Sequence, residues 1–211
     1  VYVSKYSPQG DLIWIKQFGG NFSDRPTDLA FGDANSIYVT GQFFGQVNFG
    51  AYTLNSTNNS KDIFIIKLDA NGNVLWAKSE GGTGSENAYG ITTDNQNNLI
   101  LTGQFQGQSV LNGQSFTSTI DPTTSLPSYD LFLTKYDAAG NPLWIQTGQA
   151  EYEDRGLAVS CDAQNNIFIT GQFSQTLVFG GNTFNNTGYN VGFLSKFSPT
   201  GQLVWLYQMK A

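Results

Sequence analysis

The polar and apolar positions of the chain follow a pattern that is written three times. Short runs of β-branched and aromatic residues alternate with turns rich in Gly, Asn, Asp and Pro. The runs that open the copies lie at residues 1–6, 63–68, 131–136 and 191–197. No segment shows an apolar period of 3.6 that is long enough for a helix. The pattern therefore predicts an all-β chain.

A turn with glycine at its fourth position follows each of these runs. It reads Ser-Pro-Gln-Gly-Asp at 7–11, Asp-Ala-Asn-Gly-Asn at 69–73, Asp-Ala-Ala-Gly-Asn at 137–141 and Ser-Pro-Thr-Gly-Gln at 198–202. Pro or Ala at the second position and Gly at the fourth are typical of a type I turn closed by a left-handed residue. A second run, which carries a tryptophan, comes after the turn, so we expect a β-hairpin.

Each complete copy contains two further predicted strands. One has an apolar face and a face of small side chains, and lies at residues 27–31, 89–93 and 157–161. The other is apolar throughout, as in a central strand, and lies at residues 37–39, 99–101 and 167–169. It ends in the tetrad Thr-Gly-Gln-Phe. From an axis outward, the expected order is the small-faced strand, the buried strand, the lysine strand and the tryptophan strand.

Three residue types recur at fixed distances and identify a repeat protein. The tryptophans are Trp14, Trp76, Trp144 and Trp205, which are 62, 68 and 61 residues apart. A lysine stands nine residues before each of them, at Lys5, Lys67, Lys135 and Lys196. An acid stands ten residues after the first three, at Asp24, Glu86 and Asp154. Four strands in about 60 residues are typical of a β-propeller blade.

The fold class predicted is thus all-β, a β-propeller built of four-stranded antiparallel blades, with about 3.5 blades in one segment. A half-blade spans residues 1–18, and complete blades span 19–80, 81–148 and 149–211. The 14 expected strands do not close a ring, because propellers have roughly 4 to 8 blades. We expect either a segment of a larger ring or two copies that together make seven blades. The chain starts inside a strand-like run without an initiator Met, which favours the segment.

The recurring residues resemble a known family. The pattern Lys-Leu-Asp-x-x-Gly-Asn-x-x-Trp, then Gly-Gly, then Asn-x-Leu/Ile/Tyr-x-x-Thr-Gly-Gln-Phe is similar to the bacterial seven-bladed β-propeller repeat, called the SBBP repeat. The resemblance covers essentially the whole chain. It implies a secreted or cell-surface bacterial protein with a binding or scaffolding role. Gln175 in place of Gly45 and Gly107, and Pro142 within a turn, are modest departures.

Composition and charge argue against several classes of function. The net charge is −6, the pI is near 4.4 and no Lys/Arg cluster is present, so no nucleic acid is expected as a partner. No apolar run approaches the roughly 18 residues that cross a bilayer, so we expect no membrane span. Charged residues make up only 12%, while 20 Asn and 16 Gln are present, which suits an extracellular bacterial protein.

Candidate catalytic groups are few. The chain has no histidine, which excludes Ser-His-Asp and Cys-His arrangements and histidine-ligated zinc. Cys161 has Phe31 and Thr93 at the equivalent positions, so it is interpreted as a strand residue rather than a reactive thiol. Residues 69–73 resemble the start of an EF-hand loop, but the glycine comes one residue early and no Glu stands at the twelfth position. We expect no enzyme, no metal site and no cofactor.

The recurring side chains are interpreted as structural. The tryptophans are expected to pack blade against blade rather than to stack on a sugar. Each lysine is expected to meet one of the acids ten residues past a tryptophan, for instance Lys67 with Glu86 or Asp24.

Two breaks of the repeat are candidates for a ligand site. One is the insertion at residues 117–128, and the other is the acidic segment at residues 151–155. Both flank the hairpin 131–148, and blade topology places them on one face, so we expect them to be neighbours. The candidate rim consists of Asp121, Tyr129, Glu151, Tyr152, Glu153 and Asp154. An ordinary solvated acidic loop is the alternative.

Three functions are considered. The first is a non-catalytic structural or protein-interaction module at the cell surface, whose partners are other blades of the same parent chain, a second copy, or a surface protein or glycan. The alternative is a carbohydrate-binding propeller with Tyr152 and Tyr129 at its site. The third is a fragment of a carboxylate-dependent glycosidase or lyase.

Overall fold

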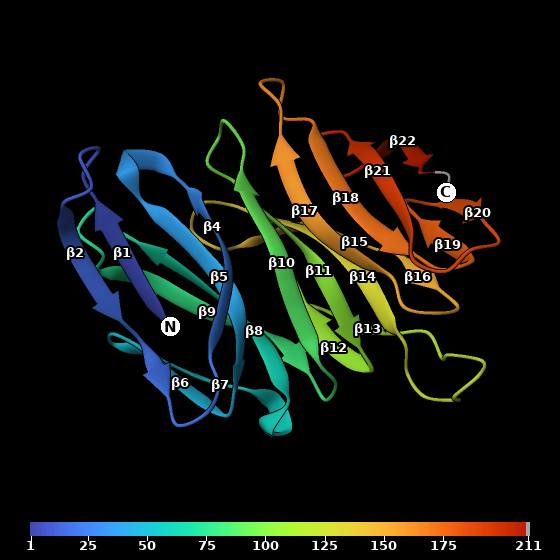
Figure 1. The fold of residues 1–211 in the computed structure, drawn as a ribbon, viewed down its shortest axis with the longest axis horizontal. Helices are drawn as coiled ribbons and strands as arrows, with labels where there is room; N and C mark the ends of the chain where they lie inside the picture. Colours follow the sequence, from blue (N-terminus) through green and yellow to red (C-terminus); the bar gives the residue numbers. More distant parts are fainter. Residues whose placement is uncertain (210–211) are drawn as a thin grey trace.

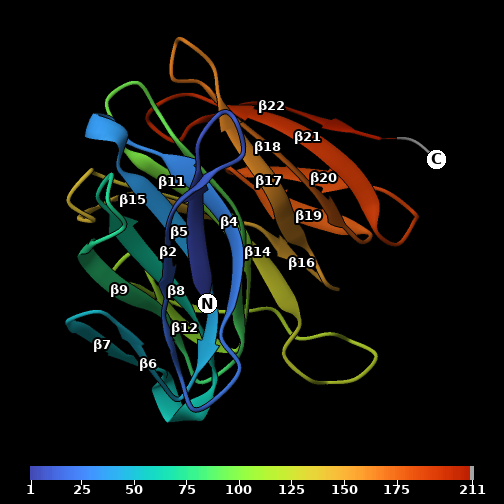
Figure 2. The ribbon, with the colours of Figure 1, turned by 60° about the vertical axis from the view of Figure 1, so that its left-hand side comes forward.

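The computed structural model describes residues 1–209 and shows an open arc of β-sheet blades (Figure 1). A half-blade and three complete blades stand side by side in chain order, and Figure 2 shows the half-blade in front of the others. Apart from two three-residue 3-10 turns, at Asp33–Asn35 and Thr57–Asn59, the regular elements in this part of the chain are strands. No helix among the described residues is long and apolar enough to cross a membrane. The third blade, predicted to end at 211, includes two residues outside this range.

Each complete blade is an antiparallel four-stranded unit, and the predicted strand order is confirmed. The first blade holds β4 (Arg25–Phe31), β5 (Ile37–Phe44), β8 (Lys61–Leu68) and β9 (Val74–Gly82). The second holds β10 (Glu86–Thr93), β11 (Leu99–Gln106), β14 (Tyr129–Tyr136) and β15 (Pro142–Thr147). The third holds β17 (Arg155–Cys161), β18 (Ile167–Phe173), β21 (Val191–Phe197) and β22 (Leu203–Gln208).

The half-blade consists of the outer pair of strands. In β1 (Tyr2–Tyr6) and β2 (Leu12–Gln17), Lys5 is the partner of Trp14, just as Lys67 is the partner of Trp76 in β8 and β9. Two copies of the chain therefore supply two outer pairs and no inner pair. The hypothesis that two copies together make seven blades, with these two outer pairs as the seventh, stays a prediction.

The turns between the outer strands have the left-handed glycine that their sequence predicts. Gly72 has φ +77°, its N–H donates to Asp69 at 3.0 Å, and Asp69 N–H donates to Asn73 at 2.9 Å. A register shift at Lys67/Leu68 accompanies the turn. The fourth-position glycines of the other copies share the left-handed backbone, at Gly10, Gly140 and Gly201.

The Thr-Gly-Gln-Phe tetrad fixes the two central strands of a blade. Thr102 Oγ1 donates to the carbonyl oxygen of Phe132 on the neighbouring strand at 2.7 Å. Gly103 lies opposite a bulge in β10, and a Cβ there would overlap the carbonyl oxygen of Asn87. Phe105 is buried in the core. Thr102, Gly103 and Phe105 thus each have a packing or hydrogen-bonding reason.

The innermost strands β4, β10 and β17 approach each other closely, as their small faces predict. A Cβ on Gly90 would lie 3.0 Å from Cα of Ala158 on the next blade. On the other side, Ile91 N–H donates to Asp28 Oδ2 at 2.9 Å. Small side chains are needed here because three blades converge.

The sequence did not predict the hairpins that follow the tetrads. They are β6 (Gln46–Phe49) with β7 (Tyr52–Asn55), β12 (Gln108–Leu111) with β13 (Gln114–Thr117), and β19 (Thr176–Phe179) with β20 (Asn182–Asn185). Each pairs with the connection that enters its blade, at β3 (Gly19–Gly20), at Gly81 and Gly82 of β9, or at β16 (Gln149–Ala150). Residues 1–209 therefore form 22 strands, not 14.

The core lies in layers between neighbouring blades. Phe43, Phe49 and Phe64 are fully buried between the half-blade and the first blade. Similar clusters of buried apolar side chains lie at the following two boundaries. The blades are thus held face to face by apolar burial.

Candidate functional site

A lysine and a tryptophan of one blade contact the outer turn of the next blade. At the first boundary, Lys5 Nζ and Trp14 Nε1 lie 3.4 and 3.1 Å from the carbonyl oxygen of Ala70. At the third boundary the same contact joins Lys135 and Trp144 to Pro199. Lys67 donates to Ala138 at the second boundary, while Trp76 Nε1 has no hydrogen-bond partner within residues 1–209.

The indole ring of each of these tryptophans also packs beneath the turn glycine. A Cβ on Gly201 would lie 2.8 Å from the ring of Trp144. The equivalent pairs are Gly72 with Trp14 and Gly140 with Trp76. We call this arrangement of lysine, tryptophan and turn the turn contact. Because it joins successive blades, its tryptophans are structural.

The partner of the lysine differs from the prediction. Lys67 Nζ lies 3.1 Å from Asp33 Oδ1, and Lys135 Nζ lies 2.7 Å from Asp94 Oδ2. Both aspartates belong to the turn between the two inner strands of the same blade. The expected pairing of Lys67 with Glu86 or Asp24 is therefore wrong.

The acids ten residues past tryptophan hold the connection between blades instead. Asp24 Oδ2 accepts the N–H of Gly20 at 2.8 Å, and Glu86 Oε2 accepts the N–H of Gly82 at 3.3 Å. Burial raises the pKa of Glu86 to about 7, although a hydrogen bond from Ser109 opposes the shift. These acids act on the local backbone.

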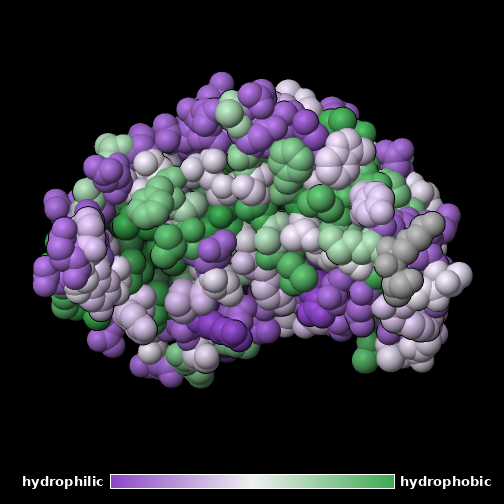
Figure 3. All heavy atoms as spheres, turned by 45° about the horizontal axis from the view of Figure 1, so that its top comes forward, coloured by the Kyte–Doolittle hydropathy of each residue, from purple (hydrophilic) through white to green (hydrophobic). Residues whose placement is uncertain are grey.

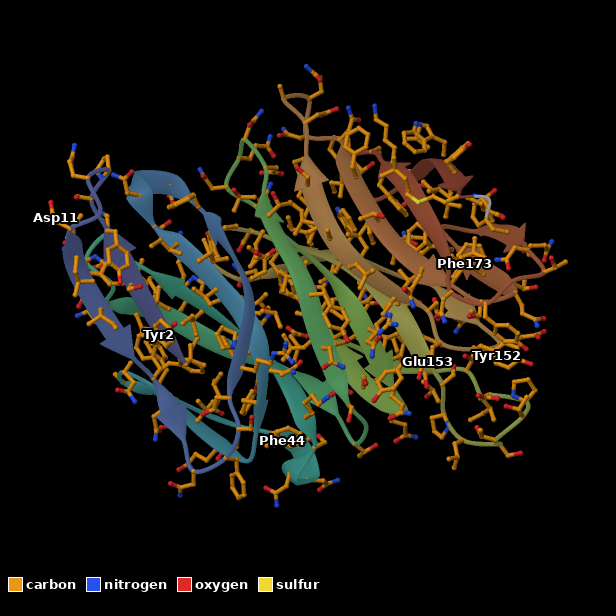
Figure 4. All side chains as sticks on the ribbon, in the orientation of Figure 1. Tyr2, Asp11, Phe44, Tyr152, Glu153 and Phe173 are labelled. Atoms are coloured by element: carbon orange, nitrogen blue, oxygen red, sulfur yellow. The ribbon has the colours of Figure 1, made fainter. Side chains whose placement is uncertain are left out.

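The two breaks of the repeat lie side by side. Thr119 Oγ1 of the insertion donates to the carbonyl oxygen of Ala150 at 2.5 Å, and Asp154 N–H donates to the carbonyl oxygen of Tyr129 at 2.8 Å. Figure 4 shows Tyr152 and Glu153 close to the loop between β13 and β14. The residues of the candidate rim are thus brought together at one end of the third blade.

Asp154 does not belong to an exposed rim. Its side chain is fully buried, and Oδ2 accepts the N–H of Leu131 at 3.3 Å. Burial, together with the nearby charge of Asp130, raises the pKa of Asp154 well above its usual value. Asp130 is equally buried and accepts Thr119 N–H at 3.0 Å, and burial raises its pKa to about 6. Both carboxyl groups therefore fasten loops.

Tyr152 has an aromatic partner that sequence reasoning missed. The rings of Tyr152 and Tyr189 meet edge to face, with centroids 5.3 Å apart. Tyr189 is 62% exposed, while Glu151 and Glu153 point into solvent nearby. The signal for Tyr189 was available, because its loop enters a lysine strand just as the insertion does.

The remaining candidates show no arrangement for catalysis or metal binding. Asp121 uses its carboxylate to accept Thr123 N–H at 2.7 Å, and the hydrogen bonds of Thr123 lower its pKa. Asp69 likewise accepts the N–H groups of Asn71 and Asn73, both at 2.8 Å. Burial raises the pKa of the Cys161 thiol to about 11. Residues 1–209 contain no cluster of three potential protein metal ligands.

Comparisons with known proteins agree with the fold. The chain is 27% identical, over 231 residues and 94% of its length, to an uncharacterized WD repeat-containing protein of Acanthamoeba polyphaga mimivirus. It is 25% identical, over 140 residues and 66% of its length, to the regulatory protein FlaEY of Caulobacter vibrioides. WD repeats form four-stranded propeller blades.

These relatives are much longer proteins, and the alignments cover only 17% and 14% of their lengths. No family model matches the chain. The similarity therefore supports a propeller-like repeat fold, and the resemblance to the SBBP repeat stays a prediction.

Proposed function

We propose that this chain is a non-catalytic structural and interaction module that binds further propeller blades at the two ends of its arc. The observation that carries the proposal is the state of Trp205. It occupies the tryptophan position of the turn contact, but no turn within residues 1–209 covers it, and it is 40% exposed. Val204 and Tyr207 beside it are also exposed. A turn from another blade would cover this face.

The opposite end of the arc offers the complementary turn. A Cβ on Gly10 would have no atom within 4 Å, whereas Gly72 and Gly201 are each covered by a tryptophan. Ile13 and Ile15 of the half-blade are exposed. Figure 3 shows apolar side chains in a band across the middle of the molecule that begins near its left-hand end, where the half-blade lies. Exposed apolar patches of this kind mark interaction surfaces.

The partners proposed are therefore other blades of a longer parent chain or a second copy of this chain. A second copy supplies a Gly-containing turn for Trp205 and a tryptophan for Gly10, and a further blade with the same repeat would supply both. A location outside the bacterial cell or at its surface, which the resemblance implies, forms part of this proposal. The burial of Asp154 removes one candidate carboxylate from the glycosidase hypothesis.

The test is the mass of the 23.0 kDa chain in solution, measured by light scattering over a range of concentrations. We expect association that Trp205→Ala weakens tenfold or more, because a central tryptophan contributes strongly to an interface. Leu126→Ala removes an apolar side chain of the insertion that is even more exposed, at 64%, and serves as the control. A wild-type chain that stays monomeric at every concentration contradicts association between copies.

A carbohydrate-binding function is the second candidate, favoured by the aromatic pair of half-buried Tyr152 and exposed Tyr189. Aromatic faces beside amide groups suit sugar rings. Loss of glycan binding in Tyr152→Ala, with association unchanged, would support this second function.

A further inference from the structure

We propose that a groove between the first and second blades binds a neutral saccharide, independently of the blade contacts at the ends of the arc. The groove has two joined hollows of about 440 and 350 Å³. The larger lies between the connection 81–83, the hairpin β12–β13 and Thr57. The smaller continues past Gly81 and Val110 toward Lys78 and Glu80. These volumes are typical of small-molecule sites.

The groove lies where the second hairpin breaks the repeat. Ser109 stands at the position held by Val47 and Leu177 in the other hairpins, both of which are fully buried. Its hydroxyl donates to Glu86, whereas the apolar residues at this position in the other hairpins offer no such hydrogen bond to the equivalent acids Asp24 and Asp154. In the second hairpin, a small polar side chain thus takes the place of a larger apolar one.

A second difference lies at Glu80. The equivalent residue in the first copy is Phe18, whose ring lies 5.6 Å from that of Phe49 and fills the space between strand and hairpin. Glu80 instead accepts Asn112 N–H at 2.6 Å and pairs with Lys78 at 2.8 Å. Both differences make this one boundary more polar than its equivalents.

The lining of the larger hollow is uncharged and rich in hydrogen-bonding groups. Thr57, Thr83, Gln108, Ser115 and Thr117 line it. The Thr57 side chain is hydrogen-bonded to Asp62, which leaves the hydroxyls of Thr83, Ser115 and Thr117 and the amide of Gln108 as the polar groups for a ligand. Hydroxyls and amides both donate and accept, so they match the hydroxyl groups of a sugar. Phe116 adds an apolar surface for the ring carbons.

The charged side chains of the smaller hollow already have ion-pair or hydrogen-bond partners within the protein. Lys78 Nζ is bound to Glu80 and to the carbonyl oxygen of Gly140 at 3.2 Å. Asp62 accepts Thr57 N–H at 3.0 Å and Ser60 Oγ at 2.7 Å. Among residues 1–209, Lys78 is the cation that lines the two hollows and it is already paired, and the chain carries a net charge of −6. These groups favour a neutral ligand over an anionic one.

The test uses a panel of immobilised neutral gluco-, galacto- and manno-oligosaccharides, followed by calorimetry with the best-bound member. Ser115→Leu blocks the larger hollow from an exposed strand position and is expected to lower the affinity tenfold or more. Thr183→Leu makes the matched change on the third hairpin and should leave the affinity within twofold.

A second variant fills the groove from within. Ser109→Val combined with Glu86→Asp installs the pair found in the first copy, Val47 and Asp24. We expect the same loss of affinity with an unchanged near-UV circular dichroism spectrum. The proposal is overturned when the wild type binds no member of the panel, when Ser115→Leu binds as well as Thr183→Leu, or when only Tyr152→Ala abolishes binding. Binding of an unstructured control peptide in preference to every sugar also overturns it.

Discussion

Lys135 Nζ lies 2.7 Å from Asp94 Oδ2, and the side chains are 5% and 0% exposed. The same ammonium group donates to the carbonyl oxygen of Pro199 on the third blade at 3.2 Å. Burial alone would raise the pKa of Asp94, but hydrogen bonds from Lys135 and Asn98 outweigh it and hold the pKa below its usual value. One lysine thus joins the inner turn of its own blade to the outer turn of the next.

Replacing this lysine is expected to destabilise the protein strongly. Lys135→Met leaves Asp94 buried without a cation, which costs about 3 to 5 kcal/mol in the free energy of unfolding. Lys67→Met is the matched control, because the side chain of Asp33 is 50% exposed and its pair contributes only about 1 kcal/mol or less. Urea unfolding measures both. Equal losses in the two variants would contradict this role of burial.

The glycine of the tetrad is expected to tolerate no side chain. Gly103→Ala places a Cβ against the carbonyl oxygen of Asn87 and 2.9 Å from the ring of Phe132, so backbone must move. We expect a loss of about 3 kcal/mol or more in the free energy of unfolding. At Gly19 the nearest atom to a Cβ is Asp24 Oδ2 at 3.4 Å, so Gly19→Ala is the control. A melting temperature unchanged in Gly103→Ala contradicts the close approach.

The blade and its strand order were predictable because recurring residues fix them. The turn glycine, the tetrad and the alternation of small and apolar positions each determine one local feature, and all three occur in register. The outer hairpins were missed because their strands have four residues and bury only two, such as Val47 and Phe49 in β6. Such short patterns resemble loops.

The aspartate that pairs with the lysine was missed because its distance in sequence from the tryptophan varies between copies. Asp33, Asp94 and Asp162 follow their tryptophans by 19, 18 and 18 residues, whereas Asp24, Glu86 and Asp154 follow by a constant ten. Constant spacing indicated importance but not the contact. The neighbourhood of residues 117–128 and 151–155 followed from topology alone, whereas the burial of Asp154 depends on side-chain packing.

Stability is expected to depend on the protonation of Glu86. The pKa of Glu86 is about 7 in the folded protein, whereas the ordinary value of 4.5 applies to the unfolded chain. The folded protein therefore binds the proton more tightly. This contribution is fully present below pH 4.5, decreases as the pH rises toward 7 and is absent above it. The difference corresponds to about 3 kcal/mol.

The measurement is the free energy of unfolding in urea between pH 4 and pH 8 for the wild type and Glu86→Gln. Because glutamine stays uncharged, we expect a smaller decline with pH in the variant. Glu153→Gln changes an exposed carboxyl group and should follow the wild type. Parallel pH profiles for wild type and Glu86→Gln would show that burial does not perturb this carboxyl group.

Trp144 and Trp205, which hold equivalent positions in successive blades, are expected to respond differently to substitution by alanine. Trp144 lies beneath Gly201 and donates to Pro199 at 3.3 Å, so Trp144→Ala opens a cavity between blades and costs about 3 to 5 kcal/mol. Trp205 has the same place in its blade but is 40% exposed, so Trp205→Ala costs the isolated chain much less. Trp205→Ala is instead expected to weaken association, because a turn from a partner is needed to complete the turn contact of Trp205. Unfolding at low protein concentration separates the two effects. Equal destabilisation of both variants under those conditions would mean that Trp205 is already packed within its own chain. This result would contradict the proposal that Trp205 belongs to a docking face.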